Sequence, residues 1–343
     1  MKISFEKVQR VASFGRTLDR ENRVAEVEKI AGLFPRGHVS IVASMAGAGK
    51  TWLTEYIACQ LSIGGQILGG LVAKSKKMKT VILAGETGTD LLDYRLSQTS
   101  WKYDPKKIRA YNAIDMMMNN LPCMMNTPEG QETIITIFAH EKPDIVFIDT
   151  LISFHSADES KQVDMTAIYT FLLRLARTFD CAIVVNHHTR KRPANFAGKR
   201  FTQEDIIGTS AGVRLCVCAY VIMAEDDGNG GSIMTVYNPK SWYKKVPEFT
   251  YKFVTDEAGL IDFAVSFDVS VKNLSWSLRD RFAEIMKSHE AGSMIKVADV
   301  AKELGVKSEA MRYYFEEATQ GGKLTKMKLA GELVYRIEKG LSR

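Results

Sequence analysis

The sequence predicts an α/β fold in which a mainly parallel sheet is extended by antiparallel strands and followed by a small second domain. Strand-like and helix-like segments alternate at the spacing of β-α-β units, and the strand-like runs are apolar throughout, as in strands covered on both faces. The 343 residues also exceed what one hydrophobic core usually holds. We therefore expect an N-terminal arm over 1–30, a large α/β domain over 31–272 and a small domain over 276–343.

The elements of the large domain follow from the spacing of apolar residues and from the Gly and Pro residues that end them. Strands of the parallel sheet are predicted at 38–44, 80–86, 108–114, 143–150 and 181–188. Helices are predicted between them at 51–65, 90–98, 128–142 and 165–180. Beyond residue 213 the pattern changes to hairpins with turns at 227–231 and 256–259, which should extend the sheet.

Composition indicates a folded protein without a membrane partner, since 45% of the residues are hydrophobic and 25% are charged. No apolar run approaches the roughly 18 residues of a membrane span, and the N-terminus lacks the apolar core of a secretory signal, so we expect a cytoplasmic protein. The net charge of +6 permits an anionic partner. The scattered cysteines lack zinc-site spacing and are expected to be buried thiols: Cys59, Cys123, Cys181, Cys216 and Cys218.

The strongest motif lies between the first predicted strand and the first predicted helix, from Ser44 to Thr51. Small residues there let backbone N–H groups approach phosphates, Lys50 supplies a charge for the β- and γ-phosphates, and the Thr51 hydroxyl binds Mg²⁺. Ser44 stands where G-x-x-x-x-G-K-T has its first glycine. A chance Gly-Lys-Thr in a turn is disfavoured because strand, loop and helix are in register. The predicted nucleotide-binding residues are Ala46, Gly47, Ala48, Gly49, Lys50, Thr51 and Trp52.

Three further polar positions end predicted strands. Asp149 stands where a Walker-B acid would hold magnesium, although many buried strands end in an Asp that caps a turn. The motif from Ser44 to Thr51 is a P-loop, and Glu86 ends the strand that follows the helix after it. Glu86 can orient the water that attacks the γ-phosphate, unless it is a solvated loop residue. His188 ends the strand after the Walker-B helix and can sense the γ-phosphate. Its neighbour His187 should point to the opposite face, which favours a sensor over a metal-binding pair.

These motifs occur in an order that resembles a known family. The P-loop, Glu86, Asp149, the H-H-x-x-K run that begins at His187 and the stretch from Gly208 to Ala211 follow one another along the chain. In this order the chain resembles the RecA-type ATPases close to the plasmid replicative helicase RepA, a group related to the DnaB-type hexameric helicases. The resemblance implies a RecA-like P-loop core that uses ATP and Mg²⁺. It also implies that Glu86 is the catalytic base, Asp149 the Walker-B acid and His188 the γ-phosphate sensor.

The same resemblance implies a ring, expected to be a hexamer, in which each ATP lies between subunits and receives a cationic finger from the neighbour. Arg214 and Lys240 are the implied finger residues. The basic run Arg190-Lys191-Arg192 follows the sensor strand. A charge run is commonly solvated surface, but this placement favours contact with DNA or with a neighbouring subunit, and the run is a second candidate for the finger.

The C-terminal segment looks like a winged helix. Helices are predicted at 277–290, 296–304 and 307–319, followed by an alternating two-stranded hairpin over 323–337. The DNA contacts expected from the recognition helix and the wing are Lys307, Arg312 and Lys326. Residues 279–343 carry thirteen Lys and Arg against ten Asp and Glu, a weak excess. Because winged helices also dock proteins, protein docking is the alternative to DNA binding.

Together these features favour an ATP-hydrolysing, ring-forming DNA helicase or translocase in the replication of a mobile element. The alternative is an ATP-switched DNA-binding regulator or loader without unwinding activity. A helicase should be stimulated by single-stranded DNA of any sequence, whereas a regulator should prefer a duplex sequence and turn over slowly. A small-molecule kinase fits poorly, because no lid with acceptor-binding residues is evident in the sequence.

Overall fold

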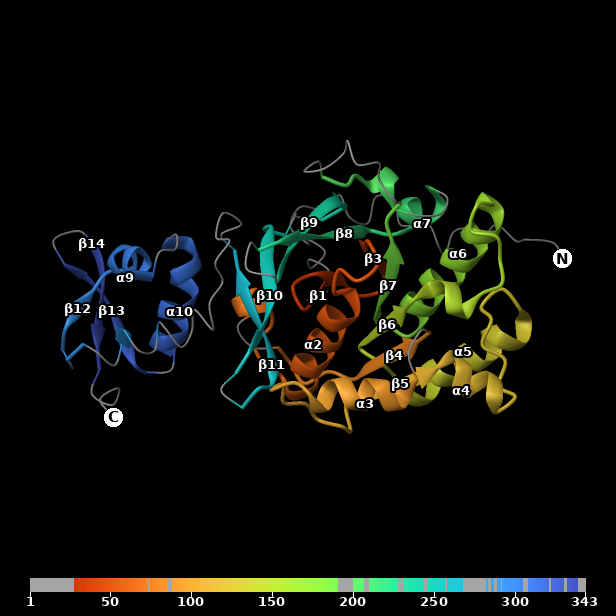
Figure 1. The fold of residues 1–343 in the computed structure, drawn as a ribbon, viewed down its shortest axis with the longest axis horizontal. Helices are drawn as coiled ribbons and strands as arrows, with labels where there is room; N and C mark the ends of the chain where they lie inside the picture. Colours follow the sequence, from red (N-terminus) through yellow and green to blue (C-terminus); the bar gives the residue numbers. More distant parts are fainter. Residues whose placement is uncertain are drawn as a thin grey trace, which may run out of the picture.

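A nine-stranded sheet forms the centre of the larger unit of this computed structural model, and a three-stranded sheet forms the smaller unit (Figure 1). The structure describes residues 28–72, 75–85, 88–190, 200–206, 210–227, 231–243, 246–256, 258–267, 282, 285–286, 289–290, 292–304, 308–320, 322–329 and 332–338.

The large sheet has the strand order β11-β10-β9-β8-β3-β7-β6-β4-β5. The six strands from β8 to β5 are parallel to their neighbours, and β9, β10 and β11 add an antiparallel extension. This arrangement confirms the predicted fold class. The strands are β3 (Val39–Ser44), β4 (Thr80–Ala84), β5 (Ile108–Asn112), β6 (Ile145–Asp149), β7 (Ala182–His188), β8 (Cys218–Asp226), β9 (Ser232–Ser241), β10 (Phe249–Thr255) and β11 (Ile261–Ser266).

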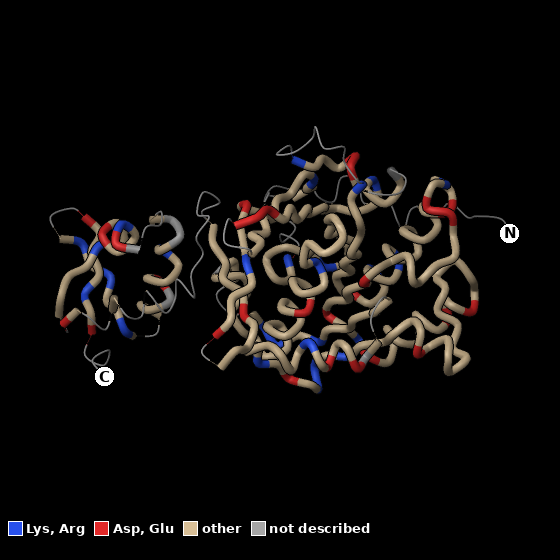
Figure 2. The backbone as a smooth tube through the Cα atoms, in the orientation of Figure 1, with Lys and Arg blue, Asp and Glu red and all other residues tan. Residues whose placement is uncertain are grey.

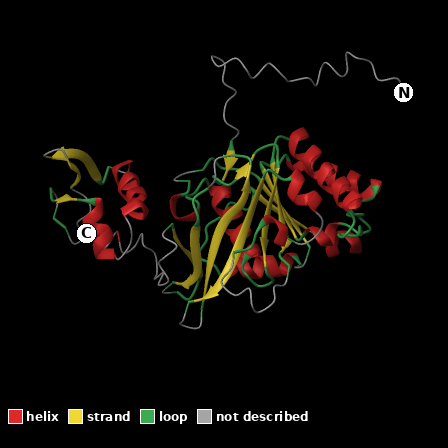
Figure 3. Ribbon diagram, turned by 90° about the horizontal axis from the view of Figure 1, so that it is seen from above, coloured by secondary structure: helices red, strands yellow, loops and turns green. Residues whose placement is uncertain are grey.

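Helices cover both faces of this sheet (Figure 3), because its central strands are apolar on both sides. In β3, Ile41 packs into the core on the α6 face and Val42 into the core on the α2 face. One face carries α2 (Lys50–Ile63) and α3 (Thr89–Ser97). The other carries α4 (Ala113–Met118), α5 (Pro128–Glu141), η2 (Leu151–Phe154), α6 (Gln162–Thr178) and α7 (Ser210–Leu215).

The register of the parallel strands places the candidate site at one edge of the sheet. Ser44, the last residue of β3, pairs with His188 of β7 and with Ile222 of β8. Asp149, the last residue of β6, pairs with Ala84 of β4. Loops that follow the carboxyl ends of these strands therefore meet at this edge, as ligand-binding loops do in open α/β sheets.

The strand predicted at 108–114 is too long, because β5 ends at Asn112 and α4 begins immediately after it. The Asn112 side chain accepts hydrogen bonds from the N–H groups of Ile114 (2.8 Å) and Asp115 (3.1 Å), which caps the new helix. Asn112 is a typical helix-capping residue, but Tyr111, Ala113 and Ile114 around it favoured the prediction that the strand continues.

The smaller unit packs two helices against its sheet, whose order is β12-β14-β13. Its elements are β12 (Met294–Ile295), α9 (Val297–Leu304), α10 (Ser308–Gln320), β13 (Leu324–Leu329) and β14 (Glu332–Ile337). The sequence predicted the hairpin but not β12, because two residues are too short to show a period. Of the helix predicted at 277–290, the structure describes only residues 282, 285–286 and 289–290.

Two features near the start of the larger unit complete the fold. The short pair of β1 (Lys29–Ile30) and β2 (Phe34–Pro35) precedes β3, and Ile30 lies in the core. Of the arm expected over 1–30, residues 1–27 lie outside the described part of the chain. All five cysteines are buried and free of disulfides. Among the described residues, no helix is long and apolar enough to cross a bilayer.

Candidate nucleotide-binding site

The loop between β3 and α2 wraps around the side chain of Lys50. Gly47 and Gly49 adopt left-handed φ angles of 77° and 80°, which glycine tolerates without strain. Lys50 is 6% exposed, and its ammonium donates hydrogen bonds to three neutral oxygen atoms of the loop: Ser44 Oγ at 2.8 Å, Met45 O at 3.4 Å and Ser44 O at 3.5 Å. A cation at the start of a helix, in a loop that lets backbone N–H groups approach closely, suits an anionic ligand such as a phosphate.

Ser44, the departure from the usual glycine pattern, acts as part of this cradle. Its hydroxyl accepts the shortest hydrogen bond from Lys50 and donates one to the Met45 carbonyl (2.7 Å). Its own carbonyl accepts from the Thr189 N–H, just beyond β7 (2.9 Å). A serine at this position therefore fits the loop and holds the lysine in place.

The residues predicted to bind magnesium suit that ion. Thr51 is half-buried at the start of α2, and Asp149 is buried at the end of β6. A hydroxyl and a carboxylate are hard oxygen ligands, and magnesium in nucleotide sites is completed by phosphate oxygens and water. In the described part of the chain no three His, Cys, Asp or Glu residues form a metal cluster. Thr51 and Asp149 would hold it.

The polar residues at the end of β7 point to opposite faces, as their alternation predicts. Asn186 donates to Thr54 Oγ1 of α2 (3.4 Å). His187 lies on the α6 side, where its Nε2 is 3.7 Å from Glu159 Oε1. His188 is on the same side as Asn186 and pairs with Ser44 in the neighbouring strand. The candidate sensor therefore lies beside the first residue of the P-loop.

Two histidines that the sequence did not assign to the site meet at Glu159. His155 follows η2, and its Nε2 lies 3.8 Å from the same Glu159 oxygen that His187 approaches. Burial lowers the pKa of His155, and it lowers the pKa of His187 to about 4, so both rings are neutral at pH 7. This cluster links the segment after Asp149 to the sensor strand.

Several predicted site residues lie outside the described residues: Glu86, Lys191, Arg192 and Lys307. The residue before Glu86 is nevertheless well placed. Gly85 donates its N–H to the Asp149 carbonyl (2.6 Å), and a Cβ on Gly85 would lie 2.3 Å from Ser153 Cβ. Only glycine fits there, so the chain enters the Glu86 segment directly beside Asp149. Of the basic run, Arg190 is described, and it is exposed two residues after the end of β7.

The two predicted finger residues lie at the opposite edge of the sheet from the P-loop. Arg214 is exposed on α7, which ends just before β8 begins at Cys218. Lys240 pairs with Ala219 at the start of β8. Four strand steps, about 13 Å, separate Cys218 from Ile222, the partner of Ser44. The Lys240 ammonium donates to the carbonyls of Val213, Arg214 (3.3 Å) and Cys216 (2.7 Å).

An aromatic cluster that the sequence did not reveal flanks the P-loop. Trp52 packs edge-to-face on Trp101, with 5.9 Å between the ring centres, and on Phe253 of β10, with 5.4 Å between the ring centres. The Tyr251 hydroxyl, also from β10, donates to the Gly49 carbonyl (3.3 Å). Because β10 follows the P-loop by about two hundred residues, no local signal marked this contact.

A buried ion pair joins the P-loop helix to α3. Glu55, one helical turn after Thr51, is 3% exposed and binds Arg95 of α3. Burial raises the pKa of Glu55 to about 7, because the desolvation of its carboxylate and the nearby Asp149 charge outweigh the attraction of Arg95. The pair fixes α2 against the helix that begins three residues after Glu86.

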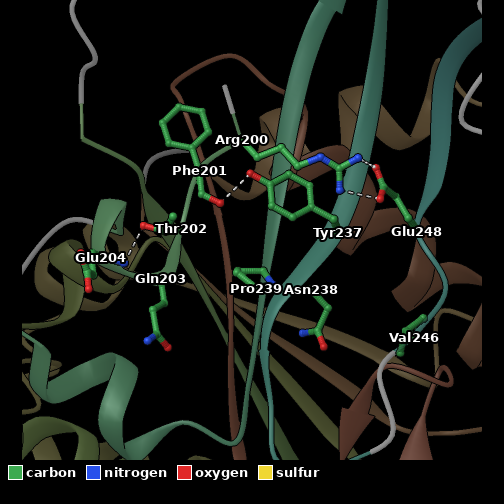
Figure 4. A pocket seen from close by; sticks show the side chains of 10 residues that line it. All are labelled: Arg200, Phe201, Thr202, Gln203, Glu204, Tyr237, Asn238, Pro239, Val246 and Glu248. Atoms are coloured by element: carbon green, nitrogen blue, oxygen red, sulfur yellow. Dashed lines mark hydrogen bonds and ion pairs between the residues drawn. The ribbon is translucent and has the colours of Figure 1, made fainter. Parts of the chain in front are cut away.

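A pocket of about 570 Å³ lies between the segment after the basic run and β9 (Figure 4). Arg200 forms two hydrogen bonds with Glu248 (2.7 and 2.6 Å) across it and lies over the Tyr237 ring. Tyr237 in turn donates to the Phe201 carbonyl (2.9 Å). The charge of Arg200 is therefore compensated within the chain.

In the smaller unit, the structure leaves one predicted DNA contact exposed and engages another. Arg312 is exposed on α10. Lys326 of β13 forms an ion pair with Glu316 of α10 and lies near the Tyr335 ring. This contact fixes the hairpin against the helix.

Comparisons with known proteins give one family and two similar solved structures. A family model described as "AAA domain" matches residues 12–194, just over half of the chain. Among solved structures, a KaiC-like protein from Pyrococcus horikoshii is similar at 14% identity and a TM-score of 0.43, covering 69% of this chain and 100% of that one. The flagellar accessory protein FlaH from Methanocaldococcus jannaschii is similar at 10% identity and a TM-score of 0.42, covering 67% and 91%. No curated protein matches.

Replacing Glu55 with Gln should change how stability depends on pH. The folded protein keeps the Glu55 proton up to about pH 7, whereas the unfolded chain loses it near pH 4.5. Glu55 therefore lowers the free energy of unfolding progressively as the pH rises between these values, by at most about 3 kcal/mol. The stability of Glu55→Gln relative to the wild type should increase over this range.

Urea denaturation of the nucleotide-free protein at pH 5 and pH 8 measures this difference. Glu132→Gln, at an exposed position of α5, is the control and should show no comparable change. An identical difference between Glu55→Gln and the wild type at both pH values would contradict the assignment.

Proposed function

Because the chain belongs to the AAA domain family, we propose that it is an ATPase that assembles into a ring and moves along single-stranded DNA, as a helicase or translocase in the replication of a mobile element. The family and the fold account for the coarser part of this statement, a RecA-like P-loop ATPase core. The ring, the hexameric state and the action on DNA are the proposal.

The observation that carries the proposal is the separation of the P-loop from Arg214. Phosphoryl transfer builds charge on the γ-phosphate, which many such enzymes stabilise with an arginine, yet the P-loop of this chain contains none. Arg214 lies on α7, on the sheet face opposite to α2 and at the other edge of the parallel strands. In this proposal Arg214 acts on the site of a second copy. Head-to-tail contacts form a ring where the rotation between copies closes, which is the arrangement that we propose here.

The remaining residues of the site have roles that follow from their positions. Lys50 would bind the β- and γ-phosphates in place of its present loop oxygens, with Thr51 and Asp149 holding magnesium, which supplies charge neutralisation when bound. Glu86 would orient the attacking water. His188 would report the γ-phosphate to the basic run, because Thr189 is bonded to Ser44 and Arg190 N–H donates to the Asp205 carbonyl (2.7 Å).

In this proposal the basic run, and not the net charge of the chain, supplies the contacts with single-stranded DNA. Lys and Arg are interspersed with Asp and Glu along the described chain (Figure 2). Arg200 is compensated by Glu248, which leaves Arg190, Lys191 and Arg192 as the proposed contacts with single-stranded DNA. In the smaller unit we propose a winged helix in which Lys307 and Arg312 contact duplex DNA, with Lys326 supporting the wing.

The ATP-switched regulator or loader is the second candidate, favoured by the same α10 and hairpin. The two functions differ in how DNA changes the rate of ATP hydrolysis.

The proposed translocase should hydrolyse ATP severalfold faster with single-stranded DNA of any sequence, measured by phosphate release at saturating ATP. Glu86→Gln should bind ATP and lose turnover with and without DNA. Slow turnover that only a particular duplex stimulates would replace the translocase with the regulator.

Deleting residues 276–343 should separate the two proposed DNA-binding elements. Every Walker element lies upstream of this unit, so ATP turnover should stay close to that of the whole chain. Duplex binding, measured by fluorescence anisotropy, should weaken, and the lost part should depend on salt. Equal duplex affinity before and after the deletion would favour protein docking for this unit.

A further inference from the structure

The edge of the sheet that carries Arg214 also carries an exposed tryptophan. Trp242 follows β9 and is 68% exposed, whereas Trp101 is buried. The backbone N–H of Trp242 donates a hydrogen bond to the Val217 carbonyl (3.0 Å), which holds Trp242 next to the start of β8. Tryptophan and arginine are enriched among the residues that dominate the binding energy of protein–protein interfaces.

Lys240 joins this tryptophan to the arginine helix. Its ammonium binds the carbonyls of Val213, Arg214 and Cys216 at the end of α7 and lies 5.2 Å from the centre of the Trp242 ring. A cation on the last carbonyls of a helix is favourable because those groups carry partial negative charge. All three ammonium protons have acceptors in this arrangement, so Lys240 is engaged within its own chain.

The position of α7 is also fixed from the other side. A Cβ on Gly212 would lie 2.6 Å from ring atoms of Tyr169 in α6, so α7 approaches α6 as closely as glycine allows. Tyr169 itself is 2% exposed. Arg214 thus projects from a helix that is held at two points, which is the pre-organisation that a trans-acting group requires.

The P-loop edge of the molecule offers a matching surface. Met45 is 48% exposed and Phe253 is 36% exposed, and both border the cradle of Lys50. A bound nucleotide would add negative charge between these apolar side chains. One edge of the protein therefore carries a cationic and an aromatic side chain, and the other becomes anionic with an apolar rim, so the two edges are complementary in charge.

We propose that Arg214 and Trp242 form the interaction surface for the nucleotide-binding edge of a second copy, and that Lys240 positions this pair instead of touching the phosphates. This inference rests on the proposed ring. It assigns Trp242 as the anchor of the interface, next to the rim formed by Met45 and Phe253. It also assigns Lys240 a role that acts through Arg214.

Association of the full-length protein tests the anchor. With Mg²⁺ and a non-hydrolysable ATP analogue, sedimentation velocity should show concentration-dependent assembly of the wild type. Trp242→Ala should weaken assembly at least about tenfold, the size typical of a central interface residue, while Trp242→Phe should weaken it less. The control is Leu329→Ala in the smaller unit, where a 57% exposed leucine is removed.

The outcomes separate this inference from the proposed function. If the wild type assembles and Trp242→Ala assembles equally well, the anchor is wrong while the ring stands. If the wild type stays monomeric at every concentration and nucleotide, the ring itself fails and the inference falls with it.

A double-mutant comparison tests Lys240. Lys240→Met should lower kcat and leave the KM for ATP unchanged, Lys240→Arg should restore part of kcat, and Lys240→Met should lower kcat no further in an Arg214→Ala background. If the two effects instead multiply, Lys240 acts on the phosphates itself and its positioning role is excluded.

Discussion

The buried ammonium of Lys50 is the interaction on which the site depends. It is 6% exposed and donates hydrogen bonds to the loop oxygens Ser44 Oγ, Ser44 O and Met45 O, so the fold holds this charge largely out of water. The left-handed glycines, the Ser44 hydroxyl and the start of α2 all converge on it. An anion that enters this loop gains both the helix N-terminus and a desolvated cation.

The parallel sheet determines what surrounds that charge and what does not. Strands that end together bring Asp149, His188 and the approach to Glu86 to one edge with Ser44. At the opposite edge, the end of α7 with Arg214 and the end of the antiparallel strand β9 with Lys240 and Trp242 meet at the start of β8, and Lys240 contacts both. One copy therefore keeps the proposed finger residues apart from its own P-loop. This separation is the reason for proposing that they act on the site of a second copy.

The sequence was most informative where chemistry and local pattern coincide. The P-loop, the apolar strands and the alternation that separates His187 from His188 were predictable because each follows from neighbouring residues. The helix α4 was hidden by an apolar run that crosses its cap at Asn112. The contacts of β10 with Gly49, the Glu55–Arg95 pair and the His155–Glu159–His187 cluster join distant segments, so only the assembled fold reveals them.

Nucleotide binding by the cradle around Lys50 is tested most directly by calorimetric titration of the 343-residue chain with magnesium and ATP. Lys50→Ala should lose at least about a hundredfold in affinity, or roughly 3 kcal/mol, because no other cation replaces the desolvated ammonium in the loop. Lys106→Ala, which removes an exposed lysine, should bind as the wild type does. Equal affinity of a folded Lys50→Ala variant and the wild type would contradict the account.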